Sequence, residues 1–197
     1  MKRIGILFFE QMEELDAFGP FEVLAFWTQS FPQDGWECRT FSADGGPVTC
    51  AKGLSVNAQL SMAEVGPLAL LVHPGGSGTR ALMKNQAHLA WVRAQQPALL
   101  TSVCTGALVY AAAGLLRGRP ATTYWGAVDE LRQADPTIEV REHTRYVDDG
   151  AIVTSAGVSA GIDMALHLVE RLVSPQRARE VARGIEYARG EFSSADR

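Results

Sequence analysis

Cys104 is the residue whose type and position point most directly to chemistry. It follows an apolar run at residues 98–103, and Thr105, Gly106 and a series of small residues come next. A buried strand that passes through one nucleophile into a helix predicts a sharp turn, which holds the side chain above the sheet edge. The start of that helix offers free N–H groups and a positive dipole end, which favour a thiolate. The alternative is that Cys104 is a small buried hydrophobe, as free cysteines often are.

A glycine-rich segment ends a second apolar run. Residues 68–72 are followed by His73, Pro74, Gly75 and Gly76. Glycines at a strand end allow backbone N–H groups to approach a ligand closely. We therefore expect Gly75 and Gly76 to line a substrate site, with the N–H groups of Gly76 and Thr105 forming an oxyanion hole. A glycine-rich turn that binds nothing is the alternative.

Acidic residues follow the first apolar run of the chain. Of Glu13, Glu14 and Asp16, we expect the first two to act as N-terminal capping residues of a helix. Asp16 would lie at the same sheet edge as Cys104. A carboxylate beside a thiol acts as a general acid, as a general base or as a group that shifts the pKa of the thiol. Helix capping is the alternative for Asp16 as well.

The rest of the chain supplies a scaffold for these residues. Short apolar, β-rich runs alternate with helical patterns, and the central runs are apolar throughout, which favours a parallel sheet buried on both faces. Strands are predicted at residues 3–9, 36–42, 68–72, 98–103 and 121–123, with hairpins at 48–57 and 145–154. Helices are predicted from Pro20, in a first turn, to Trp27, and at residues 86–95, 107–113, 127–134, 159–172 and 175–189.

Composition excludes several classes of protein. The chain has 197 residues, 47% of them hydrophobic, and a formal net charge of -4. That charge gives no electrostatic reason to expect a nucleic acid or an anionic membrane as partner, and no apolar run approaches the roughly 18–20 residues of a membrane span. Three cysteines, Cys38, Cys50 and Cys104, match no metal site or disulfide framework. We expect a cytoplasmic protein with free thiols and no metal.

The order of the motifs resembles the ThiJ/PfpI superfamily, which has the glutamine-amidotransferase-like, flavodoxin-like fold. The resemblance runs from about residue 2 to residue 171 and is closest to the isonitrile hydratase branch. It is carried by Leu15-Asp16 with Gly19-Pro20, Pro74-Gly75-Gly76, Ser102-Val103-Cys104-Thr105-Gly106-Ala107, Ala113-Gly114-Leu115-Leu116, Ala121-Thr122-Thr123 with Trp125, and Ala156-Gly157-Val158 with Gly161-Ile162-Asp163.

The resemblance implies a function and a set of roles. Cys104 would be the nucleophile, Asp16 the acid and base, and Thr105 a supporting hydroxyl. The implied enzyme adds water to an isonitrile and gives an N-substituted formamide through a thioimidate on Cys104, with no metal or organic cofactor. The implied partners are a small-molecule substrate and, by family analogy, a second copy in a homodimer.

This sequence departs from the superfamily in its histidines. Amidase-like members carry His directly after the cysteine, where Thr105 stands, and many hydratase-like relatives carry His where Tyr124 stands. Of the four histidines, only His73 is placed to reach the site. A Cys–His–acid triad is therefore not evident, which disfavours amide hydrolysis. Trp125 is predicted to wall the substrate pocket, with a place in the core as the alternative.

Two other functions remain open at this stage. One is a redox, stress or glyoxalase-like thiol protein, since an accessible thiol of low pKa oxidises readily. The other is a ligand-sensing module resembling the N-terminal half of AraC-type regulators, and we expect no DNA-binding domain here. We predict one domain over residues 1–192 and a frayed tail over residues 193–197. Asp163 is predicted to be a capping or positioning carboxylate.

Overall fold

The backbone forms a central seven-stranded sheet in the computed structural model, which describes residues 1–95 and 98–188. The strand order is β10-β11-β7-β6-β1-β2-β5, and every pair is parallel except β10 with β11. The strands are β1 (Lys2–Leu7), β2 (Trp36–Ser42), β5 (Leu60–Ser61), β6 (Leu70–His73), β7 (Leu99–Val103), β10 (Tyr146–Asp148) and β11 (Ile152–Ser155).

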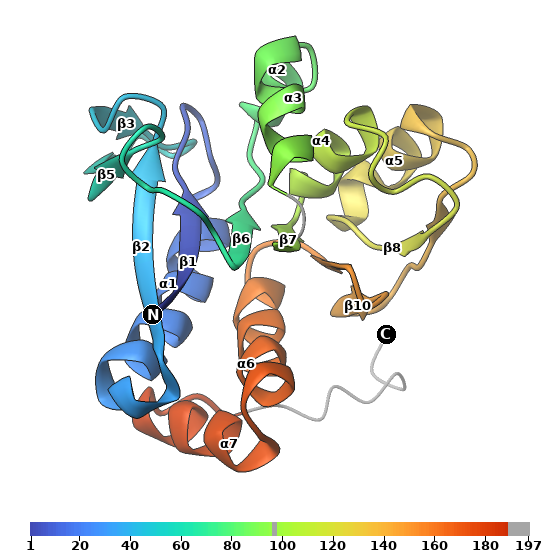
Figure 1. Cartoon of the computed structure of the whole chain (residues 1–197). Helices are drawn as coiled ribbons and strands as arrows, with labels where there is room; N and C mark the ends of the chain where they lie inside the picture. The colour runs from blue at the N-terminus through green and yellow to red at the C-terminus, as the bar shows by residue number, and fades with distance from the viewer. Residues whose placement is uncertain (96–97, 189–197) are drawn as a thin grey trace.

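Helices cover both faces of this sheet, as the sequence predicts (Figure 1). Consecutive side chains of a strand point to opposite faces. Leu70 and Val72 accordingly join one apolar cluster and Leu71 the other. The first face is covered by α1 (Glu14–Ser30), α6 (Ala160–Leu172) and α7 (Pro175–Gly184), and the second by α3 (Gln86–Ala94), α4 (Gly106–Ala112) and α5 (Val128–Ala134).

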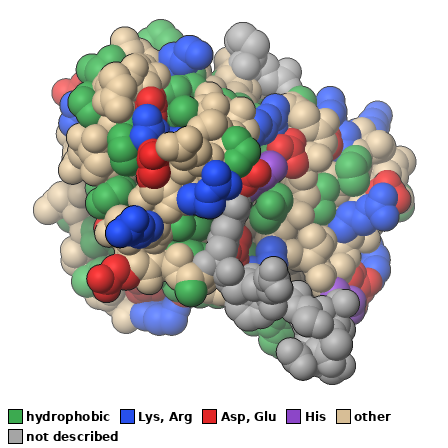
Figure 2. All heavy atoms as spheres, turned by 90° about the horizontal axis from the view of Figure 1, so that it is seen from below, with side chains coloured by type: hydrophobic (Ala, Val, Ile, Leu, Met, Phe, Trp, Pro, Cys, Tyr) green, Lys and Arg blue, Asp and Glu red, His purple; other side chains and the backbone are tan. Residues whose placement is uncertain are grey.

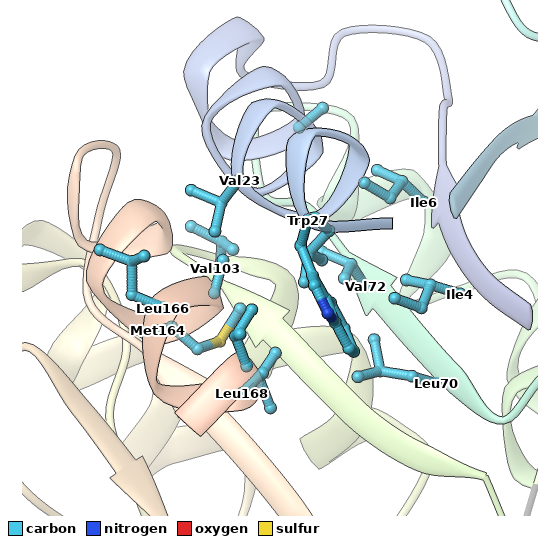
Figure 3. Close-up of a cluster of buried hydrophobic side chains, with 14 of the residues drawn as sticks. Ile4, Ile6, Val23, Trp27, Leu70, Val72, Val103, Met164, Leu166 and Leu168 are labelled. Carbon is cyan, nitrogen blue, oxygen red and sulfur yellow. The ribbon is translucent and has the colours of Figure 1, made fainter. Parts of the chain in front are cut away.

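The first cluster fixes α1 on the sheet. Trp27 of α1 and Met164 of α6 are fully buried, and Figure 3 shows them among side chains of β1, β6 and β7. Loss of a core tryptophan costs about 3–5 kcal/mol. Since α1 carries Asp16, this packing also fixes the position of that carboxyl group.

The remaining elements are short. They are β3 (Pro47–Thr49) with β4 (Ser55–Asn57), which form the predicted hairpin, β8 (Pro120–Ala121) with β9 (Glu139–Val140), α2 (Thr79–Leu82), and the 3₁₀ turns Pro32–Asp34 and Trp125–Ala127. The predicted hairpin of β10 and β11 is present. No pattern in the sequence indicated α2.

One helix boundary was predicted wrongly. Proline was expected in the first turn of α1, but the helix begins at Glu14 and Pro20 lies inside it. Proline lacks the N–H that would bond to the carbonyl of Asp16, four residues earlier. The packing of α1 against β1 and α6 keeps the helix intact across that position. The last predicted helix ends at Gly184, and residues 189–197, including the predicted tail, lie outside the described residues.

In the view of Figure 2, basic and acidic side chains are interspersed over the visible face. Over residues 1–95 and 98–188, no helix is both long enough and apolar enough to cross a membrane.

Candidate active site

Cys104 occupies the predicted sharp turn between β7 and α4. Its φ angle is 57°, a left-handed conformation that costs a non-glycine residue about 1–2 kcal/mol. Hydrogen bonds offset this cost: the Cys104 N–H donates to the carbonyls of Ser155 (3.1 Å) and Ala156 (3.2 Å). The Thr123 hydroxyl donates to the Cys104 carbonyl over 2.8 Å. The thiol is 6% exposed and lines a hollow of about 450 Å³.

The carboxyl group of Asp16 faces this thiol. Asp16 lies in the first turn of α1 and is fully buried, with 0% exposure. Its Oδ2 accepts the N–H of Gly75 over 3.0 Å and its Oδ1 accepts the N–H of Val158 over 3.1 Å. The carboxyl also hydrogen-bonds to the Cys104 thiol. Sequence reasoning placed Asp16 and Cys104 at one sheet edge, and the structure brings them into contact.

The close approach of these groups depends on Gly75. A Cβ atom at that position would lie 2.5 Å from the Thr105 nitrogen and 2.8 Å from Asp16 Oδ2. No real Cβ contact is that short, so a side chain at this position would push the two groups apart. The backbone of Gly75 thus lies against both groups, and its role in substrate binding stays a prediction.

The expected oxyanion hole is not preformed. The Gly76 N–H donates to Thr105 Oγ1 over 2.9 Å, so it is already engaged, and the Gly75 N–H is engaged by Asp16. The N–H of Thr105 instead hydrogen-bonds to the sulfur of Cys104. The Thr105 hydroxyl lies near that sulfur, donates to the Gly76 carbonyl over 3.1 Å and accepts from the Thr79 hydroxyl over 3.2 Å. Its role as a supporting hydroxyl stays a prediction.

Burial dominates the acid–base properties of the pair. It raises the pKa of Asp16 to about 7, although the hydrogen bonds from Cys104 and from the Gly75 and Val158 amides lower it. Burial, followed by the nearby Asp16 charge, raises the pKa of Cys104 to about 12. The helix N-terminus was expected to favour a thiolate, but burial and the Asp16 carboxylate raise the pKa of Cys104 more than the N–H and hydroxyl of Thr105 lower it. The two groups share protons as a coupled pair.

The aromatic wall of the hollow is Tyr124, not Trp125. Trp125 is 79% exposed and borders a neighbouring hollow of about 260 Å³. Neither the predicted place in the substrate pocket nor the alternative place in the core holds. The chain turns into a 3₁₀ helix at Trp125, which directs the two rings differently. Tyr124 borders both hollows, and its ring packs so closely on Gly157 that a Cβ there would lie 2.4 Å from Cδ2.

The mouth of the Cys104 hollow carries two ion pairs that the sequence did not indicate. Lys52 pairs with Glu13, and Arg80 of α2 pairs with Glu130 of α5. Glu13 precedes the helix without a side-chain capping bond, so the expected capping role was wrong for this residue. Because the two residues of each pair are far apart in the sequence, short sequence motifs do not predict these pairs.

His73, the histidine that the sequence analysis placed within reach of the site, does not contact Cys104 or Asp16. His73 is fully buried, its Nε2 lies 3.0 Å from Nε2 of His88, and its Nδ1 lies 2.8 Å from the Pro74 carbonyl oxygen. Burial and the neighbouring His88 lower the pKa of His73 to about 3. In the described part of the chain, no group of His, Cys, Asp and Glu residues is arranged to hold a metal ion.

Asp163 serves as a positioning carboxylate. Its Oδ2 accepts a hydrogen bond of 2.7 Å from Arg145 Nε, and its Oδ1 accepts one of 3.1 Å from the hydroxyl of Tyr187. Since Arg145 precedes β10 and Tyr187 follows α7, Asp163 ties three parts of the chain together. Val158 itself, with φ of 54°, was not singled out from the sequence as a partner of Asp16.

Comparisons with known proteins agree with this geometry. Residues 2–171 match the model of the DJ-1/PfpI family. The chain is 39% identical over 188 residues to an isonitrile hydratase of Pseudomonas putida, covering 94% of this chain and 78% of that protein. It is 36% identical over 156 residues to the HTH-type transcriptional regulator CdhR of Pseudomonas aeruginosa, covering 77% of this chain and 45% of the regulator.

Solved structures show the same fold. A THiJ/PfpI family protein from Pseudomonas syringae superposes with a TM-score of 0.83 at 28% identity and covers 100% of this chain and 79% of its own. Drosophila melanogaster DJ-1beta superposes with a TM-score of 0.82 at 23% identity, covering 95% of this chain and 98% of its own. The likeness to DJ-1beta supports the fold alone.

Proposed function

The chain belongs to the DJ-1/PfpI family, and on that premise we propose that it is an isonitrile hydratase, which adds water to R–N≡C and releases the formamide R–NH–CHO. The observation that carries the proposal is the contact between Cys104 and Asp16 with no histidine at either group. The relative named isonitrile hydratase, 39% identical over most of both chains, supports the same reaction.

The first step forms a covalent intermediate. The terminal carbon of an isonitrile accepts a proton and then a nucleophile. The Asp16 carboxylate takes the thiol proton through their hydrogen bond and delivers it to that carbon, while Cys104 Sγ forms the new C–S bond. The product is the thioimidate R–N=CH–S–Cys104. The N–H and hydroxyl of Thr105 stabilise the sulfur while it carries negative charge.

The second step hydrolyses this intermediate. Asp16 accepts a proton from water as the water oxygen attacks the thioimidate carbon, and the nitrogen is protonated in return. In the resulting R–NH–CH(OH)–S–Cys104, Asp16 takes the hydroxyl proton while the C–S bond breaks. That proton passes to the sulfur as the formamide leaves. Asp16, with a pKa raised to about 7, exchanges a proton in both directions near neutral pH. The cycle needs no further acid or base.

Two features weigh against the alternative thiol chemistries. A redox sensor uses an accessible thiol of low pKa, whereas Cys104 is 6% exposed and burial raises its pKa to about 12. Amide hydrolysis uses a base such as histidine beside the nucleophile, and His73 is engaged by His88 and Pro74 instead.

A ligand-sensing role is the second candidate, and one observation favours it. Four of the similar proteins are transcriptional regulators, among them CdhR at 36% identity, and this chain covers less than half of each. In that case the hollow at Cys104 would bind a small molecule without turnover. Binding without product formation by the unmodified protein would favour this reading over the hydratase.

The test of the proposed function is direct turnover. The protein is incubated with cyclohexyl isocyanide, and N-cyclohexylformamide is measured by liquid chromatography and mass spectrometry. Cys104→Ala should lower the rate by at least about a thousandfold. Cys38→Ala, which removes a thiol on β2 that does not line the hollow, should leave the rate unchanged. Formamide production that persists in Cys104→Ala refutes the mechanism.

The oligomeric state and the cellular location are also proposals. We expect a homodimer and a cytoplasmic enzyme. Sedimentation velocity of the purified protein tests the first expectation, and a single species at the mass of one chain contradicts it. Cell fractionation tests the second.

A further inference from the structure

A second hollow lies on the other side of the loop that follows β1. Its volume is about 500 Å³, larger than the hollow at Cys104. It is bordered by the end of β1, the segment after β2, β3, and α3. In Figure 1 these elements lie at the upper end of the sheet. The volume falls in the range of pockets that bind small molecules.

The two hollows are separate sites. Phe9 and Glu10 border the second hollow, Glu13 borders the hollow at Cys104, and the two share no lining residue. The loop between them is held in place by main-chain bonds. The Gln11 N–H donates to the Thr49 carbonyl over 2.7 Å, and the Glu13 N–H donates to the Gly75 carbonyl over 2.9 Å. A ligand in one hollow therefore does not occupy the other.

The walls of the second hollow are apolar and aromatic. Phe9 and Trp91 are half-buried, and both border the space together with Met62, Leu82 and Val48. Trp91 contacts Phe41, with ring centroids 5.7 Å apart, and stacks on His88, with ring centroids 5.9 Å apart. Such walls bind an apolar body, and an aromatic face also attracts a cation.

The charges at the rim are of one sign. The lining residues include the carboxylates of Glu10 and Asp44 and contain no Lys or Arg. Both side chains are exposed, and neither forms a salt bridge with any described residue. Their contacts are hydrogen bonds from backbone amides, those of Thr49 and Gly46. The rim is thus matched to a positive charge.

The histidine in the wall adds an acceptor. The Pro74 carbonyl can only accept, so Nδ1 of His73 carries the proton of this neutral ring and Nε2 bears a lone pair. Nε2 of His88 must then donate to it, and Nδ1 of His88 is left as an acceptor. His88 borders the hollow, and among residues 1–95 and 98–188 its Nδ1 has no hydrogen-bond partner.

From these three features we propose that the second hollow is a binding site for a hydrophobic organic ammonium ion, a small amine with one aryl or cycloalkyl body. The apolar body packs between Phe9 and Trp91. The ammonium group donates to the carboxylates of Glu10 and Asp44 and to Nδ1 of His88. This site is independent of the proposed hydratase activity and stands whether or not that activity is found.

The test compares three ligands of similar shape by isothermal titration calorimetry on the whole protein. They are phenethylammonium, the uncharged phenethyl alcohol and the anionic phenylpropionate. Phenethylammonium should bind at least about fivefold more tightly than the alcohol, because it adds an ion pair and a cation over an aromatic ring. Phenylpropionate should bind more weakly than both.

Variants locate the binding. Glu10→Gln and Asp44→Asn should each weaken phenethylammonium binding by about two- to fivefold and leave phenethyl alcohol unaffected. Glu13→Gln, which removes a charge at the other hollow, is the matched control and should change nothing, and Cys104→Ala should bind as the parent does. Equal affinity for the amine and the alcohol, absence of amine binding in the folded protein, or weakening by Glu13→Gln instead of Glu10→Gln would each overturn the proposal.

Discussion

Replacing Asp16 by asparagine separates the charge of this carboxyl group from its shape. Asp16 is fully buried and burial raises its pKa from 3.8 to about 7. The folded chain therefore holds a proton there that the unfolded chain releases. Below about pH 3.8 Asp16 is protonated in both the folded and the unfolded chain, and its ionisation does not affect stability. As the pH rises from there through 7, ionisation favours the unfolded state, so folding is progressively weakened.

The size of the effect follows from the two pKa values. A shift of about 3 units is worth about 4 kcal/mol when the pH exceeds both pKa values. When the pH rises from about 4.5 to about 8, the ionisation of Asp16 lowers the free energy of unfolding by about 3 kcal/mol. Asparagine cannot ionise and avoids it, but its NH₂ group would face the N–H of either Gly75 or Val158, which costs about 1–3 kcal/mol at every pH.

The assay is urea unfolding of the two proteins over a series of pH values, followed by tryptophan fluorescence. The difference in unfolding free energy should move in favour of Asp16→Asn by about 3 kcal/mol between about pH 4.5 and about pH 8. The same comparison in a Cys104→Ser background removes the coupling to the thiol. Asp129→Asn, whose side chain is 86% exposed, is the control for surface carboxylates. A difference that does not depend on pH would refute the claim that burial raises this pKa.

Three further outcomes follow from the same geometry. The kcat/KM for isonitrile should rise with pH through about 7 and then reach a plateau. The reason is that the proposed mechanism needs one proton shared by Asp16 and Cys104, and the pKa of Cys104 is raised to about 12. A fall in kcat/KM through pH 7 in stopped-flow assays would contradict the mechanism. Gly75→Ala should lower kcat by about a hundredfold, since its Cβ would displace Asp16 and Thr105, and unchanged kinetics would show that the site adapts. Thr105→Val should lower kcat by about tenfold while Thr105→Ser retains it, and equal loss in both would assign Thr105 a packing role only.

Much of the scaffold was predictable because its signals are local. The apolar runs that become β1, β2, β6 and β7, and the nucleophile turn at Cys104, follow from the order of residue types over ten positions or fewer. Since the carboxyl ends of parallel strands meet at one edge, the approach of Asp16 to Cys104 also followed once the strands were assigned. Pro20 was misplaced because its tolerance inside α1 depends on packing against β1 and α6, which no local pattern records.

What the sequence determined by itself was which residues share the sheet edge, since the carboxyl ends of parallel strands meet there whatever the order of the strands. The tertiary structure alone decided what each of them does there. It engages the Gly76 amide with Thr105, turns Trp125 to solvent and Tyr124 to the hollow, and buries His73 against His88. It also raises the pKa of both Asp16 and Cys104. Desolvation and side-chain direction depend on atoms contributed by segments distant in the chain, and the residue types along the sequence do not specify those atoms' positions.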